Sequence, residues 1–504
     1  MGIRNQQAVV IGAGIGGLTA GALLAKRGFD VFVLEQAIIP GGCASTFKRR
    51  GFAFDVGATQ VAGLEPGGVH YKIFEELGVA LPESTPCDPA CAVYLPDEPE
   101  PISVWRNPAQ WKQERSQKFP GSEPFWEKMD ELFDISWRFN SRDPILPPTD
   151  FKDLITLGTK LRPETLSTLP YTWKTVTDVL KEYDLQGNKK LCRFLDMQLK
   201  LYSQVEADET AVLYAAVALG LSTEPQGLYH LQGSMQVLAD RLVQGLNKYG
   251  GRLLVQQQVQ LILRENGKVV GVQVFDKRKN QVWQVRADQI FANVTPDALS
   301  QMLDGKGDER PFHQLARLDK LPEPSGAFVV YLGVDRATIP EDCPLHLQFI
   351  YDFEGPIGEN NSLFVSVSKP GDGRAPEGKA TIIASSFTDT KSWWQMARED
   401  YEGMKKRYTE EAIDRLAGFF PNLRKHILHV EAATPRTFHQ FTARPLGGVG
   451  GLGQRPAQFG PFSFSNRTPY ANLWLVGDST YPGEGTAGVS YSALNALTLM
   501  EKSL

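Results

Sequence analysis

The sequence predicts an α/β fold in which a Rossmann-type dinucleotide-binding domain is interleaved with a second domain of mixed sheet and helix. Three observations lead to this prediction. The chain opens with the pattern strand, glycine-rich turn, helix, strand. Dense glycine returns near the other end, at 447–453 and 477–488. Proline-rich and helical segments lie between, so one domain is assembled from distant parts of the 504 residues.

The opening segment has the pattern of one βαβ unit. Residues 8–11 form a short apolar run, residues 18–26 have helical spacing, and residues 31–34 form a second buried strand. The turn between them matches G-x-G-x-x-G at the place where a pyrophosphate-binding turn belongs. Glycine lets the backbone approach the phosphates, and the helix N-terminus offers free N–H groups. We therefore expect dinucleotide binding by Gly12, Gly14, Gly16 and Gly17.

The residues after the second strand favour FAD over NAD. A carboxylate at Glu35 accepts hydrogen bonds from ribose hydroxyls and repels a 2′-phosphate, which fits either cofactor. A Pro-Gly-Gly follows too soon for the second βαβ unit that would complete an NAD site. Paired glycines there, and a further block at 51–59, let a long extended dinucleotide lie directly on backbone. These blocks add Gly41, Gly42, Gly57, Ala58 and Thr59 to the expected FAD site.

A second cofactor segment is predicted near the C-terminus. Residues 472–478 read as a strand ending in Gly477-Asp478, where the aspartate is placed to bind a ribityl hydroxyl. A glycine-rich stretch follows, and a helix is expected from about Val489. A helix start at this point directs N–H groups from Gly488 and Val489 toward the flavin edge that gains negative charge on reduction.

The two predicted domains alternate along the chain. Segments 1–75, 226–300 and 441–504 are expected to form the FAD-binding domain. Segments 76–225 and 301–440 are expected to form a substrate-binding cap with membrane-facing helices. Expected cap helices lie at 123–138, 208–221 and 393–416, and expected cap strands lie at 327–332, 362–368 and 380–385. The tryptophan-rich stretch 105–173 mixes aromatic residues with Lys and Arg, as interfacial segments do.

Composition excludes several classes of function. A net charge of −5 gives no electrostatic reason to expect nucleic acid. Five cysteines show no zinc spacing, and the histidine pair His426 and His429 is expected on opposite faces of a strand, so no metal site is predicted. The glycine motif leaves no room for a signal peptide, and the apolar run 211–221 is too short to span a bilayer. A cytoplasmic protein associated peripherally with a membrane is expected.

The combination of motifs resembles the phytoene desaturase and prolycopene isomerase family. The glycine turn, the Pro-Gly-Gly, the Gly-Phe-x-Phe-Asp-x-Gly block and the terminal Val-Gly-Asp…Pro-Gly-x-Gly carry the resemblance. The last third looks most similar to the C-3′,4′ desaturases of photosynthetic prokaryotes. The resemblance implies a GR2-like FAD fold, with the backbone of Val259 at the adenine. It further implies hydride transfer from an acyclic C40 carotene to flavin N5, a bilayer-borne substrate, and quinone or oxygen as electron acceptor.

Two other functions remain open, and two residues near the flavin are singled out. The block at 49–58 resembles the cis–trans isomerase version as much as the desaturase version. A flavin-free prenyl-lipid chaperone uses the same scaffold, but the intact glycine, Glu35 and Asp478 set argues against it. Glu484 faces the flavin edge in the family arrangement and is the candidate catalytic proton acceptor. Cys43 is expected to be a small space-filling residue.

Overall fold

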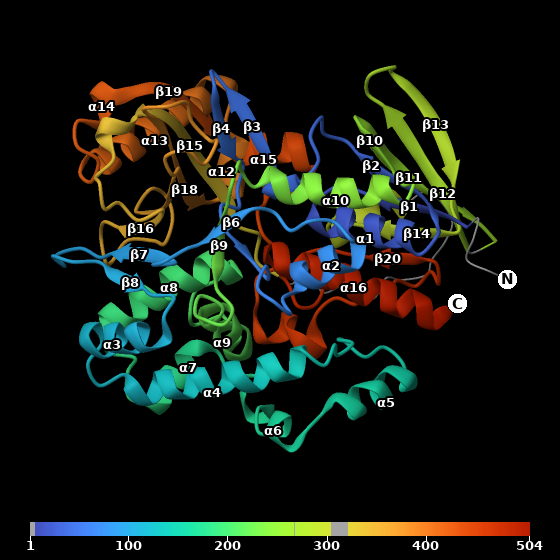
Figure 1. Cartoon of the computed structure of the whole chain (residues 1–504), viewed down its shortest axis with the longest axis horizontal. Helices are drawn as coiled ribbons and strands as arrows, with labels where there is room; N and C mark the ends of the chain where they lie inside the picture. Colours follow the sequence, from blue (N-terminus) through green and yellow to red (C-terminus); the bar gives the residue numbers. More distant parts are fainter. Residues whose placement is uncertain (1–5, 267, 304–320) are drawn as a thin grey trace.

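The first layer of the structure is a five-stranded parallel sheet drawn from three distant chain segments. The computed structural model describes residues 6–266, 268–303 and 321–504 (Figure 1). The strand order is β10-β2-β1-β14-β20, and every neighbouring pair is parallel. The strands are β1 (Gln7–Ile11), β2 (Asp30–Glu35), β10 (Arg252–Val255), β14 (Gln289–Ala292) and β20 (Leu473–Leu475).

Both faces of this sheet are covered, as its apolar strands require. In β1, Ala8 and Val10 pack with the helices, whereas Val9 and Ile11 pack with a three-stranded antiparallel sheet on the other side. The helices are α1 (Ile15–Lys26), α2 (Val69–Leu77), α10 (Gln236–Lys248) and α16 (Gly485–Ser503), and the covering strands are β11 (Gln257–Glu265), β12 (Lys268–Asp276) and β13 (Gln281–Arg286). Almost all of α1 is buried, because it lies between the sheet, α10 and α16.

The second layer is a seven-stranded mixed sheet in the order β19-β15-β18-β17-β16-β7-β8. The strands are β7 (Cys91–Tyr94), β8 (Ile102–Val104), β15 (Gly326–Asp335), β16 (His346–Ile350), β17 (Ser362–Val367), β18 (Lys379–Thr388) and β19 (Ile427–Ala433). One face packs against α12 (Thr390–Gln395), α13 (Arg398–Ala417) and α14 (Leu423–His426), with Trp393 and Phe420 fully buried between them.

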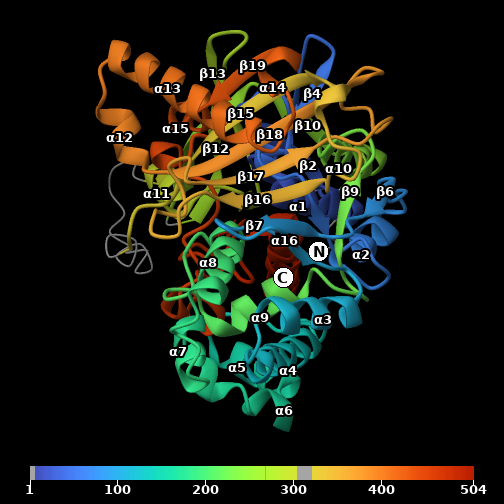
Figure 2. The same cartoon turned by 90° about the vertical axis from the view of Figure 1, so that its left-hand side faces the viewer.

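A helical layer lies below the two sheets in Figure 2. It consists of α3 (Pro108–Lys118), α4 (Glu123–Asn140), α5 (Phe151–Lys160), α6 (Pro163–Leu166), α7 (Val176–Glu182), α8 (Lys189–Ser203) and α9 (Val212–Gly220). Trp111 and Trp126 are buried in its aromatic core beside Phe194. These two tryptophans are therefore core residues and do not form the interfacial face suggested by the tryptophan-rich stretch. Short elements join the layers: β3 (Thr46–Arg49), β4 (Phe52–Asp55), β5 (Val61–Ala62), β6 (Ser84–Pro86), β9 (Leu228–Leu231), α11 (Pro296–Leu303) and α15 (Pro435–Thr442).

A buried ion cluster ties three of these segments together. The Arg374 guanidinium bonds to the Asp55 carboxylate at 3.0 Å and to the Asp372 carboxylate at 3.2 Å. The Nε2 atom of His230 lies 2.9 Å from the same Asp372 oxygen. Although burial opposes it, the bond from His230 and the charge of Arg374 lower the pKa of Asp372. Asp55 comes from β4 and His230 from β9, so the cluster fixes the β-rich joint between the layers.

The α/β fold class is confirmed, with several corrections to individual elements. The helix expected at 393–416 is two helices, α12 and α13, because Met396 and Ala397 adopt extended backbone. The helix expected at 208–221 is confined to Val212–Gly220. His426 ends α14 and His429 lies on β19, so the two do not share a strand. The proposed domain limits remain a prediction, and residues 1–5 and 304–320 of those domains lie outside the described residues.

Among the described residues, no helix combines the length and the apolar character needed to cross a bilayer.

Candidate active site

One cavity of about 760 Å³ extends between the parallel sheet, the mixed sheet and the helical layer. It brings together nearly all of the predicted site residues. Its walls include Gly12, Gly14, Gly16, Glu35, Gly41, Gly42, Gly57, Ala58, Thr59, Val259, Gly477, Asp478, Glu484, Gly488 and Val489. Gly17 does not line the cavity. A Cβ atom on Gly17 would lie 2.1 Å from the carbonyl oxygen of Gly12, so this glycine allows the helix to approach the turn closely.

The glycine turn is completed by a residue that the sequence analysis missed, Asn293. It directly follows β14, the parallel neighbour of β1, and therefore reaches the same edge of the sheet. A Cβ atom on Gly14 would lie 2.7 Å from Asn293 Nδ2, and one on Gly12 would lie 2.8 Å from the Asn293 carbonyl oxygen. Any side chain on these glycines would therefore disturb the turn. The sequence feature that could have identified Asn293 as a site residue is its position directly after a buried strand.

Glu35 lies at the carboxyl end of β2, where a ribose would be held. Its carboxylate accepts N–H bonds of 2.7 Å from Ala13 and from Ala37. Burial raises the pKa of Glu35, and these backbone donors partly offset that effect. Each carboxylate oxygen keeps a lone pair for a ribose hydroxyl. Val259 lies on β11 and lines the same region of the cavity, so these residues fit the adenosine half of a dinucleotide.

The Pro-Gly-Gly segment continues the backbone surface beside the turn. Gly41 has φ +117° and donates its N–H to the Ala13 carbonyl at 2.7 Å. A Cβ atom on Gly57 would lie 3.1 Å from the carbonyl oxygen of Cys43, so the two blocks are in close contact. Burial raises the pKa of the Cys43 thiol, which keeps it neutral. An extended dinucleotide fits this run of exposed backbone.

Helix α16 begins at Gly485, four residues before the expected start at Val489. Gly488 and Val489 are therefore the fourth and fifth residues of the helix, so Val489 lies beyond the first turn, and Glu484 is the residue that precedes the helix. Gly485 and Thr486 are weak helix formers, so the sequence alone favoured a later start. The first turn still presents N–H groups to the cavity, as the flavin edge requires.

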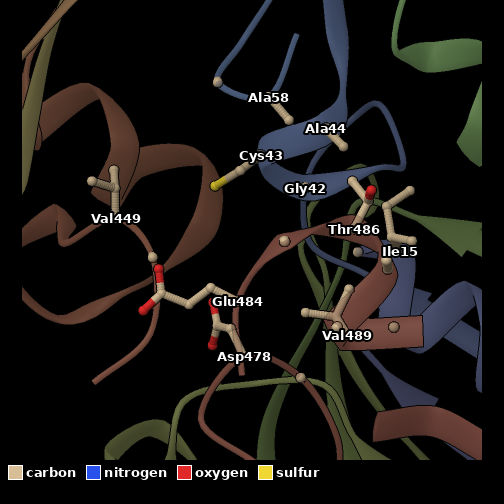
Figure 3. A pocket seen from close by; sticks show the side chains of 18 of the residues that line it. Ile15, Gly42, Cys43, Ala44, Ala58, Val449, Asp478, Glu484, Thr486 and Val489 are labelled. Carbon is tan, nitrogen blue, oxygen red and sulfur yellow. The ribbon is translucent and has the colours of Figure 1, made fainter. Parts of the chain in front are cut away.

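Glu484 lies beside a second acid and a half-buried cation. In Figure 3 the side chains of Glu484 and Asp478 lie next to each other, and Cys43 approaches from the N-terminal segment. The guanidinium of Arg444 bonds to the carboxylate of Asp478. Burial and the charge of Asp478 raise the pKa of Glu484 to about 8. The sequence analysis missed Arg444, because its pairing with Asp478 joins positions 34 residues apart and cannot be predicted from spacing.

Two amide side chains flank the Glu484 carboxyl. Gln454 Nε2 donates to Glu484 Oε1 at 3.5 Å, and Gln204 also bonds to Glu484. Gln204 has φ +64° at the C-terminus of α8. Both amides occupy space left by glycines, because a Cβ atom on Gly450 or Gly483 would lie 2.4 Å from them. This arrangement holds a single carboxyl group in a defined place.

The remainder of the cavity has largely apolar walls, with a few polar side chains such as Gln348, Ser385 and Tyr214 among them. One side is formed by Met197, Leu201, Val217 and Leu221 of the helical layer, and the other by Val329, Leu363, Ile383 and Phe387 of the mixed sheet. An apolar chamber next to a dinucleotide cradle suits a hydrocarbon substrate, because binding removes its surface from water.

Comparison with known proteins agrees with this geometry. A family model of NAD(P)-binding Rossmann-like domains matches residues 10–77. The chloroplastic prolycopene isomerase of Daucus carota is 29% identical, over 97% of this chain and 79% of its own length. The 4,4′-diapophytoene desaturase of Staphylococcus aureus is 26% identical, over 98% of both chains. Cyclohexylamine oxidase from Brevibacterium oxydans has the same fold, with a TM-score of 0.62 at 16% identity over 99% of both chains.

The fold and the site define a class: the protein is an oxidoreductase with a Rossmann-like dinucleotide-binding domain. Its homologues are the prolycopene isomerases and the diapophytoene desaturase of the carotenoid desaturase and isomerase family.

Proposed function

We propose that the protein is an FAD-dependent carotenoid desaturase. The substrate is an acyclic C40 carotene of the lycopene or 1-hydroxylycopene type, and the new double bond is at C-3′,4′. One observation carries the proposal: a single cavity joins a dinucleotide cradle to apolar walls and places the carboxyl of Glu484 among them. The desaturase of Staphylococcus aureus, which matches along 98% of this chain, supports the choice of reaction.

The described residues fit FAD along its length. Glu35 and Val259 are placed for the adenosine half, the glycine turn at Gly12 for the pyrophosphate, and Asp478 for the ribityl chain. The start of α16 is placed for the flavin edge. When bound, FAD supplies the oxidant that takes a hydride from an allylic carbon.

The residues of the chain orient the carotene and handle the proton. Desaturation removes a hydride and a proton from neighbouring carbons, and the electrons of the second C–H bond form the new double bond. The apolar walls exclude water and hold the polyene in one position. The ionised Glu484 carboxylate accepts the departing proton, while Gln204 and Gln454 fix its position. The oxidant is regenerated by a quinone or oxygen.

A cis–trans carotene isomerase with reduced FAD is the second candidate. The specific observation in its favour is the match to prolycopene isomerase of Daucus carota, at 29% identity against 26% for the desaturase. In that reaction Glu484 acts in its neutral form, as a proton donor to the polyene. Its raised pKa keeps a neutral form available at neutral pH.

Anaerobic mixing of the oxidised holoenzyme with carotene tests the proposal. Lycopene or 1-hydroxylycopene in liposomes is expected to bleach the flavin absorbance in one turnover, and a quinone is expected to restore it. Isomerisation of poly-cis lycopene by the reduced enzyme, with no bleaching of the oxidised enzyme, would contradict desaturation. A purified protein that neither carries FAD nor takes it up would favour a flavin-free lipid-binding role.

A further inference from the structure

Helix α5 is an amphipathic helix whose apolar side faces away from the protein. Among its ten residues only Asp153 is buried. Phe151, Leu154 and Ile155 lie three and four positions apart, on one face, and are 75%, 54% and 55% exposed. A helix on a globular protein normally turns such a face toward the core. Here that face has no cover from the described residues.

The exposed apolar surface continues along the chain beyond α5. Leu166, Leu169 and Trp173 are each at least half exposed. Figure 1 places α5 and α6 at the outer edge of the helical layer, away from the two sheets. We call residues 151–173 the α5–α6 surface. Several exposed apolar side chains together with an exposed tryptophan are typical of a contact with lipid.

The uncompensated charge of the α5–α6 surface is positive. Its acids have cationic partners from elsewhere: Asp153 pairs with Arg467, and Glu164 with Arg142 at 3.6 Å. No carboxylate in the described part of the chain pairs with the cations Lys152, Lys160 and Arg162. The chain as a whole carries −5, so this local excess is not a property of the composition. Such an excess complements anionic lipid headgroups.

The α5–α6 surface is connected to one wall of the cavity. The cavity wall there is formed by the end of α4 and the residues after it, including Asn140, Ser141 and Asp143. Arg142, within this group, donates to the Thr165 hydroxyl of α6 at 3.1 Å. The apolar surface and the cavity wall are therefore linked by a direct side-chain contact.

We propose that the α5–α6 surface docks on a lipid bilayer containing anionic lipid. The helix lies in the headgroup region with Phe151, Leu154 and Ile155 directed toward the acyl chains, and the lysines contact phosphates. The wall of the cavity at Asn140 and Ser141 is then on the membrane side of the protein. The choice of a bilayer as partner rests on the proposed function, since a carotene is stored there.

Vesicle sedimentation with the full-length holoenzyme tests the docking surface without substrate. The protein is expected to sediment with phosphatidylcholine vesicles containing phosphatidylglycerol. The variant Phe151→Ser/Ile155→Ser/Trp173→Ser is expected to lose roughly tenfold or more in partitioning. The matched control Val282→Ser/Leu428→Ser/Val430→Ser removes side chains of similar exposure elsewhere and is expected to bind normally. A charge variant, Lys152→Glu/Lys160→Glu/Arg162→Glu, is expected to lose binding to anionic vesicles most strongly at low salt.

Equal flavin content and melting temperature across the variants establish that each is folded. The proposal would be overturned if the unmodified protein failed to bind the vesicles containing phosphatidylglycerol. It would also be overturned if the variant Phe151→Ser/Ile155→Ser/Trp173→Ser bound them equally well. Light scattering that shows the first variant dissociating a dimer would assign the surface to a second copy of the chain. Activity on detergent-dispersed carotene separates the two ideas: no turnover with normal vesicle binding contradicts the proposed reaction and leaves the docking surface standing.

Discussion

Arg444 and Asp478 form an ion pair in the wall of the cavity, directly beside the carboxyl of Glu484. Arg444 pairs with the carboxylate of Asp478, and this carboxylate lies next to Glu484. Glu484 receives that charge as a neighbour and is buried as well, so its pKa rises to about 8. Burial, together with the charge of Asp478, therefore sets the protonation of the one acid proposed to act on the substrate.

The pH dependence of turnover follows from this arrangement. If Glu484 accepts a proton, the rate rises with pH through a midpoint near 8, because only the ionised form is competent. Glu484→Gln is expected to lower the single-turnover rate by about 10²-fold or more and to remove the inflection. A rate that falls through the same midpoint would indicate a proton donor, as in the isomerase. A profile without an inflection would exclude Glu484 from either role.

Asp478→Asn is expected to move that midpoint to lower pH, by about one to two pH units. The charge of Asp478 raises the pKa of Glu484, so its removal makes ionisation easier. The rates are measured at saturating FAD, so that the shift of the pH midpoint is not confused with weaker cofactor binding. Asp414→Asn, in an exposed pair with Arg424, is the control and leaves the midpoint unchanged.

Glu484→Gln is also expected to change the pH dependence of stability. The folded-state pKa of Glu484, about 8, lies above its ordinary value of 4.5. Between those values the folded protein binds more protons than the unfolded chain, so this group makes the protein less stable as pH rises. Glutamine does not titrate, so the Glu484→Gln variant does not lose this stability as pH rises. Its melting temperature relative to the natural protein is expected to increase from pH 5 to pH 8, and a constant difference would contradict the raised pKa.

Gly17→Ala tests the close approach of α1 to the glycine turn. The new methyl would lie 2.1 Å from the Gly12 carbonyl oxygen, so backbone must move and FAD binding is expected to be lost. Gly403→Ala in α13 has open space around it and is expected to stabilise the protein by about 0.5–1 kcal/mol. Flavin content measures FAD binding by Gly17→Ala, and denaturant unfolding measures the stability of Gly403→Ala. Normal flavin content in Gly17→Ala would contradict the geometry.

Arg374→Met is expected to cost about 3–5 kcal/mol of unfolding free energy, because it leaves the carboxylates of Asp55 and Asp372 buried without their cation. Arg424→Met removes a cation from exposed ion pairs and is expected to cost about 0–1 kcal/mol. Urea unfolding of both variants gives the comparison. Equal losses would mean that the buried cluster contributes no more than a surface pair.

Local patterns identified residues that line one cavity, because the glycine turn and Glu35 belong to one continuous βαβ unit, and their role in binding a cofactor stays a prediction. Asn293 and Arg444 were missed as site residues because their positions depend on strand order and on a loop crossing to Asp478. Glu484 was predicted as the candidate acid, but its raised pKa depends on tertiary neighbours.

The α5–α6 surface also could not be predicted from local sequence patterns. Tryptophan content drew attention to residues 105–173, yet the exposed apolar surface is formed mainly by aliphatic residues around α5. Burial of Trp111 and Trp126 depends on how the helices pack, which composition does not specify.

The mass of the carotenoid product tests the central claim most directly. The holoenzyme is incubated with lycopene or 1-hydroxylycopene in anionic liposomes with a quinone, and the product is analysed by mass and absorption spectrum. The account predicts the loss of two hydrogens and a red-shifted spectrum. An unchanged mass with an altered retention time, on poly-cis lycopene and with reduced flavin, would contradict it and identify an isomerase.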